Sequence, residues 1–419
     1  MAQAVVSATA RTRDRMLDGI RGYAIVLVLL SHTWIIAPTG NWTAVTWLFS
    51  SGDYAVTIFF VVSGFLATRA MLRERDRTGK IRPGVIWLRR WIRISAHVYP
   101  LVILVLALTA ANWNLMVAYQ GTNTRESAFR IITYTWNGYV RQHALEARPD
   151  LGHLWYVCTD LWVIGLILLI VFLVGRWRPA LVATLVATLL VVMVYRHHVY
   201  ETEGLFSALT RVQTRADGLL WGALAAAVFP WVQRLQRYAV PALWASTVLL
   251  VPLLGAVVDP SGYFGLGGWL LNIDMAVFVL AVALTSPPRL LARTVGWGPL
   301  ALAGRYSLVL YIWHYPLFWY FSKNDTEWSW QTRTLLSYLI TLLISITAQL
   351  VIERPVQRWL SSDKWHALDR GIGPALVAAA IRVKDEAWSR IAGARERDPV
   401  VEEDALAPVT SHDEETADR

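Results

Sequence analysis

Residues 17–32, LDGIRGYAIVLVLLSH, form an apolar run of helical length that contains two ionisable side chains, and this combination decides the fold class. A helix that crosses a bilayer needs roughly 20 apolar residues. Arg21 and His32 are eleven positions apart, which is about three helical turns and roughly 16 Å along the axis. Both side chains are therefore expected on one helix face, with Arg21 at the inner edge of the membrane and His32 deeper.

The composition of the whole chain is that of a membrane protein. Of its 419 residues, 55% are hydrophobic and 16% are charged, whereas soluble proteins have about 25% charged residues. This excludes an ordinary soluble enzyme and a disordered chain. We expect an all-α, polytopic transmembrane bundle of about ten helices. The expected spans are residues 20–37, 54–70, 96–111, 152–174, 180–195, 216–231, 240–258, 269–285, 301–321 and 333–352.

The distribution of basic residues predicts the orientation of the bundle. The net charge is +9, and the basic residues lie between the apolar runs. Positive loops on the cytoplasmic face explain this pattern, so no nucleic acid is expected as a partner. The expected inner loops, above all 69–93, hold more Lys and Arg than the outer loops. Both termini are thus predicted in the cytoplasm, and residues 1–16 form a basic cytoplasmic N-terminus.

The C-terminal part changes character after the last span. Residues 356–394 are expected to be cytoplasmic and include a candidate amphipathic helix that could lie on the membrane surface. Residues 395–419 form an acidic tail that we expect to be disordered. The single cysteine, Cys158, is expected to be a small buried residue. Motifs for zinc proteases, phosphate-binding loops and serine-hydrolase elbows are absent from the sequence, so nothing in it supports a metal, ATP use or hydrolysis.

Ionisable residues inside membrane spans are costly and therefore mark functional sites. Histidine is the usual general base near neutral pH, which favours His32 for proton transfer. An anion held by Arg21 could extend a reactive end to His32, and the pantetheine arm of an acyl-CoA has about the length of three helical turns. The alternatives are a helix-packing role for His32 and an interfacial, snorkelling role for Arg21.

Residues 17–32 resemble the opening of the acyltransferase 3 family of integral-membrane acyltransferases, which begins with an Arg and a His separated by ten residues. Similar motifs follow in the family's order. They are TIFFVVSGFL at 57–66, RRWIRI at 89–94, HLWYVCTD at 153–160, RADGLLWGALAA at 215–226, GRYSLVLYIWHYP at 304–316 and ERP at 353–355. The resemblance implies a membrane acyltransferase domain over residues 17–355. We expect the stand-alone form of the family, without an extracytoplasmic esterase-like domain.

The resemblance also implies a reaction and its residues. Family members move acyl groups, often acetyl, from cytoplasmic acyl-CoA to hydroxyl groups of glycans, glycolipids or other small molecules. His32 would then be the base and Arg21 would hold the donor phosphate, with an acyl-histidine intermediate as the alternative. Arg89, Arg90 and Arg93 are further candidates for donor phosphates, although positive-inside topology alone could explain them. No bound cofactor is expected, and acyl-CoA, with acetyl-CoA favoured, is the co-substrate.

Other polar residues in the matched motifs are candidates for the substrate pocket. They are Ser63, Asp160, Arg215, Tyr311, His314 and Glu353. Helix packing, an aromatic belt and structural ion pairs are the alternatives for this set. Asp160 stands where the family has the first of two glutamates, and the second acid is missing, so a two-carboxylate role is in doubt. His97 is an extra candidate because the segment after Arg93 departs from the family pattern.

A secondary transporter or flippase for a lipid-linked or anionic solute is the competing function. Buried Arg and His suit both classes, but transporters often consist of two similar halves, and no such repeat is found here. The richness in Ala, Arg and Trp favours a bacterial source. We therefore expect a multi-pass protein of the inner (plasma) membrane whose partners are an acyl-CoA donor, a carbohydrate or glycolipid acceptor and the bilayer. The acceptor, the acyl length and the oligomeric state stay open.

Overall fold

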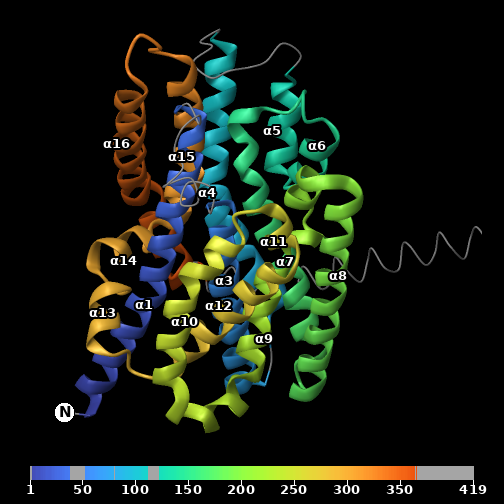
Figure 1. Ribbon diagram of the computed structural model, residues 1–419, viewed down its shortest axis with the longest axis vertical. Helices are drawn as coiled ribbons and strands as arrows, with labels where there is room; N and C mark the ends of the chain where they lie inside the picture. Colours follow the sequence, from blue (N-terminus) through green and yellow to red (C-terminus); the bar gives the residue numbers. More distant parts are fainter. Residues whose placement is uncertain (1, 38–51, 80, 112–121, 364, 366–419) are drawn as a thin grey trace, which may run out of the picture. The chain divides into compact units, whose positions relative to one another are not determined.

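Helices are the regular elements of the described part of this chain. The computed structural model describes residues 2–37, 52–79, 81–111, 122–363 and 365, and the regular elements within these ranges are all helices (Figure 1). Seven helical stretches there are long and apolar enough to cross a membrane. They are Tyr54–Thr78, Pro83–Ala110, Pro149–Val174, Arg178–Thr210, Asp217–Ala256, Leu266–Leu284 and Trp330–Leu360. The predicted all-α membrane fold is confirmed, whereas the count of about ten spans and the cytoplasmic termini stay predictions.

The first part of the chain contains three long helices, a small helical cap and a fourth long helix. Its elements are α1 (Ala2–Ser31), η1 (His32–Ile35), α3 (Gly52–Thr78), α4 (Pro83–Ala110), α5 (Thr124–Ile132), α6 (Trp136–Gln142), η2 (Pro149–Leu154) and α7 (Trp155–Val174). The prediction of a basic loop over 69–93 is wrong, because α3 continues to Thr78 and α4 already begins at Pro83. Proline is favoured at the first helical position, where its missing N–H would have no partner. The arginines that follow it therefore lie on a helix.

The second part of the chain consists of long helices joined by short helical turns. Its elements are α8 (Arg178–Thr210), η3 (Gln213–Arg215), α9 (Asp217–Val232), η4 (Gln233–Tyr238), α10 (Ala239–Ala256), α11 (Pro260–Phe264), α12 (Leu266–Leu284), α13 (Arg289–Thr294), α14 (Gly298–Arg305), α15 (Ser307–Lys323), α16 (Trp330–Ala348), η5 (Gln349–Glu353) and α17 (Arg354–Leu360). Gly204, with a φ of 81°, kinks α8. η5 is a π-helical turn, a feature frequent at functional sites.

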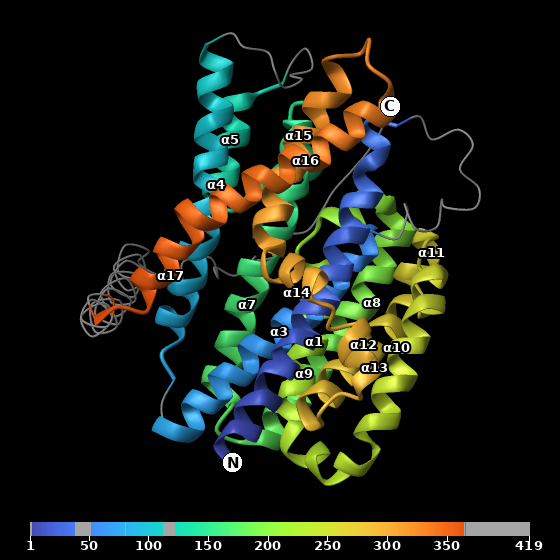
Figure 2. The same ribbon diagram turned by 90° about the vertical axis from the view of Figure 1, so that its left-hand side faces the viewer.

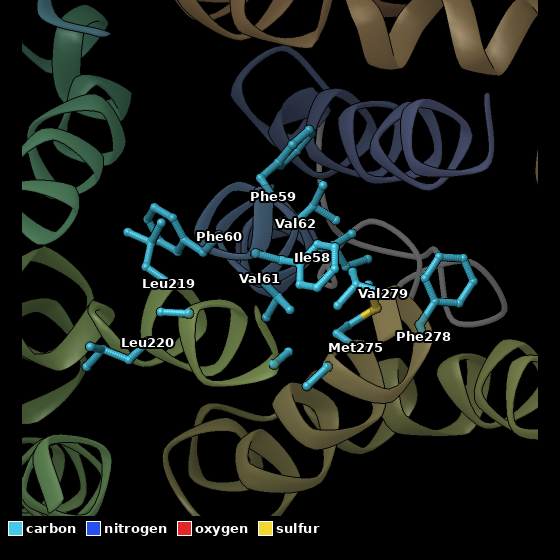
Figure 3. Packing of buried hydrophobic residues seen from close by; sticks show 14 of the residues in the cluster. Ile58, Phe59, Phe60, Val61, Val62, Leu219, Leu220, Met275, Phe278 and Val279 are labelled. Atoms are coloured by element: carbon cyan, nitrogen blue, oxygen red, sulfur yellow. The ribbon is translucent and has the colours of Figure 1, made fainter. Parts of the chain in front are cut away.

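The core of the bundle is built around α3, which packs against α1, α7, α9 and α12. Figure 3 shows Ile58 and Val61 of α3 in one apolar cluster with Leu219 of α9 and Met275 of α12. Lipid tails are as apolar as these side chains, so close packing rather than water exclusion holds such helices together.

Two glycines allow α3 and α9 to approach closely. A Cβ atom on Gly64 would collide with the backbone of Leu219, and one on Gly222 would collide with the carbonyl of Val61. Small residues at such positions let helix backbones meet in a membrane. Because Ser63 precedes Gly64, this contact also fixes the position of Ser63 on α3.

The cap formed by α5, α6 and η2 contains a buried ion pair. In Figure 2, α5 lies beside α4. The helix α6 packs against α7 and α8. Arg148 donates to both carboxylate oxygens of Asp150, over 2.9 and 2.6 Å, and its Nη1 also donates to Thr124 Oγ1. The side chains of both residues are buried. The pair fixes η2, and η2 carries His153.

The expected spans lie mainly on helices, with two differences. Residues 216–231 and 240–258 are joined through η4 into one continuous helical stretch, Asp217–Ala256. Residues 301–321 are divided at Tyr306 between α14 and α15. The segment 356–394 begins with α17. Its remainder from residue 366, including the candidate amphipathic helix, and the acidic tail of 395–419 lie outside the described residues.

Candidate active site

A cavity of about 360 Å³ lies among α1, α3, α4, α7 and α15, and this volume is within the range of small-molecule sites. Its walls combine cationic, aromatic and aliphatic side chains. The lining residues are Arg21, Phe59, Ser63, Leu66, Ala67, Arg90, Arg93, Ile94, Tyr156, Val157, Asp160, Ser307, Leu308 and Tyr311. The structure thus brings six of the predicted site residues together from five helices.

Arg90 is held by a carboxylate and a hydroxyl group from two neighbouring helices. Its Nε and Nη2 donate to the two oxygens of Asp160, each over 2.5 Å, and Nη2 also donates to Ser63 Oγ over 2.6 Å. Asp160 is buried, so removing Arg90 would leave an uncompensated charge. Two parallel bonds fix the plane of the guanidinium group. Arg90 is therefore already oriented at the cavity wall.

Arg93, one turn further along α4, is held by Glu353. Arg93 Nε donates to Glu353 Oε1 over 2.5 Å, His97 Nε2 lies 2.9 Å from Oε2, and Gln357 Nε2 donates to Oε1 over 2.6 Å. The π-helical turn η5 places Glu353 at this point. Glu353 was a candidate for the substrate pocket, but it does not line the cavity. Its link to the cavity is its hydrogen bond with Arg93, which does line the cavity.

Arg21 completes the cationic wall from α1. Its Nη2 donates to Ser307 Oγ over 2.8 Å, and its Nη1 lies 3.4 Å from Asp18 Oδ1. Asp18 is shared with Arg305, at 3.6 Å. The side chains of Arg21, Arg90 and Arg93 keep 24%, 27% and 40% of their surface exposed. Each can therefore still donate to an anion, and guanidinium groups suit phosphate oxygens in particular.

His32 lies beside a second histidine from α15. α1 ends at Ser31, and the tighter turn η1 begins at His32. His32 Nδ1 is 2.9 Å from His314 Nε2, and the two rings are stacked with centroids 5.1 Å apart. His314 is fully buried, whereas His32 is half-buried. The pair thus has one enclosed member and one accessible member.

A proline in α15 links this pair to a third histidine. Pro316 has no N–H, so it cannot bond the carbonyl four residues earlier, that of Ile312. His153 Nε2 lies 3.1 Å from that carbonyl oxygen. The ring of His153 also stacks on Tyr315 with centroids 4.7 Å apart. The motif His-x-Pro therefore attaches η2 to α15 next to His314.

Tyr311 connects the cavity with the histidines. Its ring lines the cavity beside Tyr156, with centroids 4.9 Å apart, and also lies 5.6 Å from the ring of His314. Its hydroxyl group donates to the backbone carbonyl of His153 over 2.7 Å. The arginine wall and the histidine pair are thus neighbours separated by one aromatic side chain.

Two predicted site residues lie outside this arrangement. Arg89 is 5.5 Å from the ring of Trp365 and does not line the cavity. Arg215 is fully buried against the rings of Trp155 and Tyr263, at 5.2 and 4.7 Å. All three contacts are of the cation–π type, which stabilises packing.

Several residues of the site were not among the predicted pocket or catalytic residues. Ser307 and Tyr156 line the cavity, His97 contacts Glu353, and His153 contacts the histidine pair. His97 had been singled out by its departure from the family pattern. His153 lies in the quoted segment 153–160. Its sequence signal was the proline of the His-x-Pro motif, because a proline inside a helix leaves the carbonyl group four residues earlier without its usual N–H donor.

The comparison with family models identifies the chain. The model described as an acyltransferase domain matches residues 14–353, which is most of the sequence. The chain belongs to the acyltransferase 3 family. The predicted family is confirmed, and the matched region of this family member includes the cavity and the histidine pair.

Curated relatives carry related names. O-acetyltransferase OatA of Staphylococcus aureus is 26% identical over 361 residues, both in strain NCTC 8325 and in strain COL. The similarity covers 82% of this chain and 57% of each relative, so the chain spans little more than half the length of these relatives. No solved structure gives a significant match.

Proposed function

We propose that this acyltransferase 3 family member is a membrane O-acyltransferase. It moves a short acyl group, with acetyl favoured, from acyl-CoA to a hydroxyl group of a glycan, glycolipid or related envelope molecule. The observation that supports this best is the cavity with three arginines next to the histidine pair, with Tyr311 in contact with both. One region suits an anionic donor, and the adjoining one suits proton transfer.

The arginine wall is suited to the phosphates of coenzyme A. Arg21, Arg90 and Arg93 present guanidinium groups whose partners hold them in place before a ligand arrives. Such preorganisation lowers the entropy that binding costs. Along α1, His32 lies roughly 16 Å beyond Arg21, about the length of a pantetheine arm. The apolar residues that line the cavity, including Phe59 and Leu308, would contact that arm as it extends towards His32.

His32 is the proposed general base. It removes the proton from the acceptor hydroxyl group, and the oxygen attacks the carbonyl carbon of the thioester. The carbon–sulfur bond then breaks, and the CoA thiolate takes the proton from His32. The products are an ester and CoA with a free thiol. An acyl group carried on His32 would give the same products in two steps, and an acid quench with labelled donor distinguishes the two routes.

The relatives support the proposed acyl group and location. OatA is named an O-acetyltransferase, which favours acetyl as the group and a hydroxyl group as the acceptor. Its source is a bacterium, and the described part of this chain contains seven helical stretches long and apolar enough to cross a membrane. We place the protein in the inner (plasma) membrane, with the arginines towards the cytoplasm, where acyl-CoA is present. Mass spectrometry of envelope glycolipids from a deletion strain would name the acceptor by its missing acetyl group.

The test uses the purified full chain in lipid nanodiscs. With labelled acetyl-CoA and a glycolipid extract of the host envelope, we expect release of CoA thiol and transfer of label to the extract. His32→Gln should lower turnover by about 100-fold or more, since triad-type bases contribute at this scale. The matched control is His197→Gln, because His197 is an exposed histidine on α8. It should turn over like the unmodified protein.

Two results would contradict this function. One is turnover by His32→Gln equal to that of the control. The other is the absence of CoA release with the extract while labelled glycolipid crosses reconstituted vesicles, which would favour the flippase alternative.

A further inference from the structure

One ring nitrogen of His314 faces backbone carbonyl oxygens, and the other faces His32. Its Nδ1 lies 2.7 Å from the carbonyl oxygen of Tyr311 and 3.1 Å from that of Leu310. Its Nε2 lies 2.9 Å from His32 Nδ1. A carbonyl oxygen can only accept a hydrogen bond, so His314 Nδ1 must carry a proton.

This proton determines the direction of the bond between the rings. A neutral imidazole has one N–H, so His314 Nε2 has a lone pair and accepts. The donor is then His32 Nδ1, which must carry the proton of that ring. The lone pair of His32 is left on Nε2, and Nε2 becomes the basic atom.

The opposite direction is unfavourable for two reasons. If His314 Nε2 donated from a neutral ring, its Nδ1 lone pair would face two carbonyl oxygens. If both nitrogens carried protons, the ring would be a fully buried cation. Its neighbours include the side chains of His153, Tyr315 and Phe318, and none of these is an acid. A buried charge needs a charged partner or several hydrogen bonds to offset its desolvation.

We propose that His314 is a positioning residue that holds His32 in the tautomer with its proton on Nδ1. This rests on the proposed function, in which His32 Nε2 takes the proton of the acceptor hydroxyl group. When His32 becomes imidazolium, its bond to His314 becomes charge-assisted and stronger. The contact therefore stabilises the transition state more than the ground state, which accelerates the reaction. His314 Nε2, oriented by the backbone carbonyls of α15, does here what the buried carboxylate does in a Ser-His-Asp triad.

The test compares two amides that differ in reach. His314→Gln can place its amide oxygen near the position of His314 Nε2 and accept from His32. His314→Asn can still bond the carbonyls of α15 but ends before His32. With acetyl-CoA and the envelope glycolipid extract as probes, we expect His314→Asn to lower kcat by about 10- to 100-fold with KM for acetyl-CoA within about twofold. His314→Gln should keep at least about a third of kcat.

Controls separate positioning from folding. Rates are expressed per CoA-binding site and thermal unfolding is recorded for both variants, so a misfolded fraction does not enter kcat. His197→Leu, an exposed histidine lost from α8, should leave kcat and KM unchanged.

The outcomes separate a failure of this inference from a failure of the proposed function on which it rests. Equal activity of both His314 variants, whether high or low, would overturn the positioning role, as would a more active Asn variant. If His32→Gln is inactive in the same assay, the proposed function survives that failure. If His32→Gln is fully active, both the function and the role of His314 are wrong.

Discussion

Two pairs of arginine and aspartate show how the same chemistry serves different ends in this bundle. Arg90 and Asp160 meet at the cavity wall, where the arginine keeps 27% of its side-chain surface exposed. Arg196 of α8 and Asp217 of α9 are ion-paired with 0% and 1% exposure. Asn272 also donates to Asp217, over 3.0 Å. Neither member of the second pair lines the cavity.

The difference lies in what remains accessible once the ion pair has formed. Both pairs avoid an isolated charge inside the bundle, which would be costly. The cavity pair leaves one face of a guanidinium group available to an anion. The enclosed pair leaves none, so its contribution is to helix packing. Burial, and not residue type, therefore distinguishes a binding arginine from a structural one here. Substitutions at the cavity should mainly change donor binding, and substitutions at the enclosed pair should mainly change stability.

The largest expected effect is on stability, in the enclosed pair. Asp217→Leu leaves Arg196 buried without its carboxylate and should lower the free energy of unfolding by about 3–5 kcal/mol. Unfolding by SDS titration measures this. The matched control is Asp76→Leu, because Asp76 pairs with Arg178 at an exposed site, and surface pairs contribute about 0–1 kcal/mol. Equal losses in the two variants would show that burial does not matter.

Arg90→Gln should affect both properties, because the cavity pair is partly enclosed. The KM for acetyl-CoA should rise by about 10- to 100-fold, as expected for the loss of a hydrogen bond to a charged group. Asp160 would lose its cation, so stability should also fall, by about 1–3 kcal/mol. Steady-state kinetics and SDS titration on one preparation test this. An unchanged KM would remove Arg90 from donor binding.

Arg93→Gln should affect binding with little effect on stability. Arg93 is the most exposed of the three cavity arginines, at 40%, and Glu353 would keep His97 and Gln357 as partners. We expect the KM for acetyl-CoA to rise by about tenfold. Glu353 is buried but keeps two hydrogen-bond partners, so the loss of stability should be about 1 kcal/mol, below that of Arg90→Gln. A loss of stability as large as that of Asp217→Leu would contradict the distinction between the regions.

The smallest effect is expected for Arg89→Gln. Arg89 shares the basic segment with Arg90 and Arg93 but contacts Trp365 instead of the cavity. Its loss should leave the KM for acetyl-CoA within about twofold and remove one cation–π contact of about 0.5–1 kcal/mol. A tenfold rise in KM would mean that donor binding extends beyond the cavity lining.

The sequence was informative wherever the signal was local. Apolar runs predicted the membrane helices. The shared helix face of Arg21 and His32 stays a prediction, because α1 ends at Ser31 and His32 begins the turn η1. The basic segment 69–93 was expected as a loop, but most of it lies on α3 and α4. A proline at a helix start explains why the charges lie on α4 instead.

The partners of these residues could not be predicted, because they come from distant parts of the chain. His314 is 282 positions from His32, and Glu353 is 260 positions from Arg93. The doubt about a two-carboxylate role arose because a second acid is missing near Asp160. Two carboxylates do contact the arginines of α4, but the second is Glu353, which a π-helical turn brings to Arg93.

The most direct test of the central claim is to measure CoA binding and acetyl turnover separately on two variants, by equilibrium titration and CoA-thiol release in nanodiscs. His32→Gln should bind CoA with a Kd within about twofold of the unmodified protein and lose turnover by about 100-fold or more. Arg93→Gln should bind CoA about tenfold more weakly and regain most of its turnover at saturating donor. If His32→Gln turns over normally, or if Arg93→Gln binds CoA as tightly as the unmodified protein, then the arginine cavity and the histidine pair do not divide donor binding and proton transfer between them.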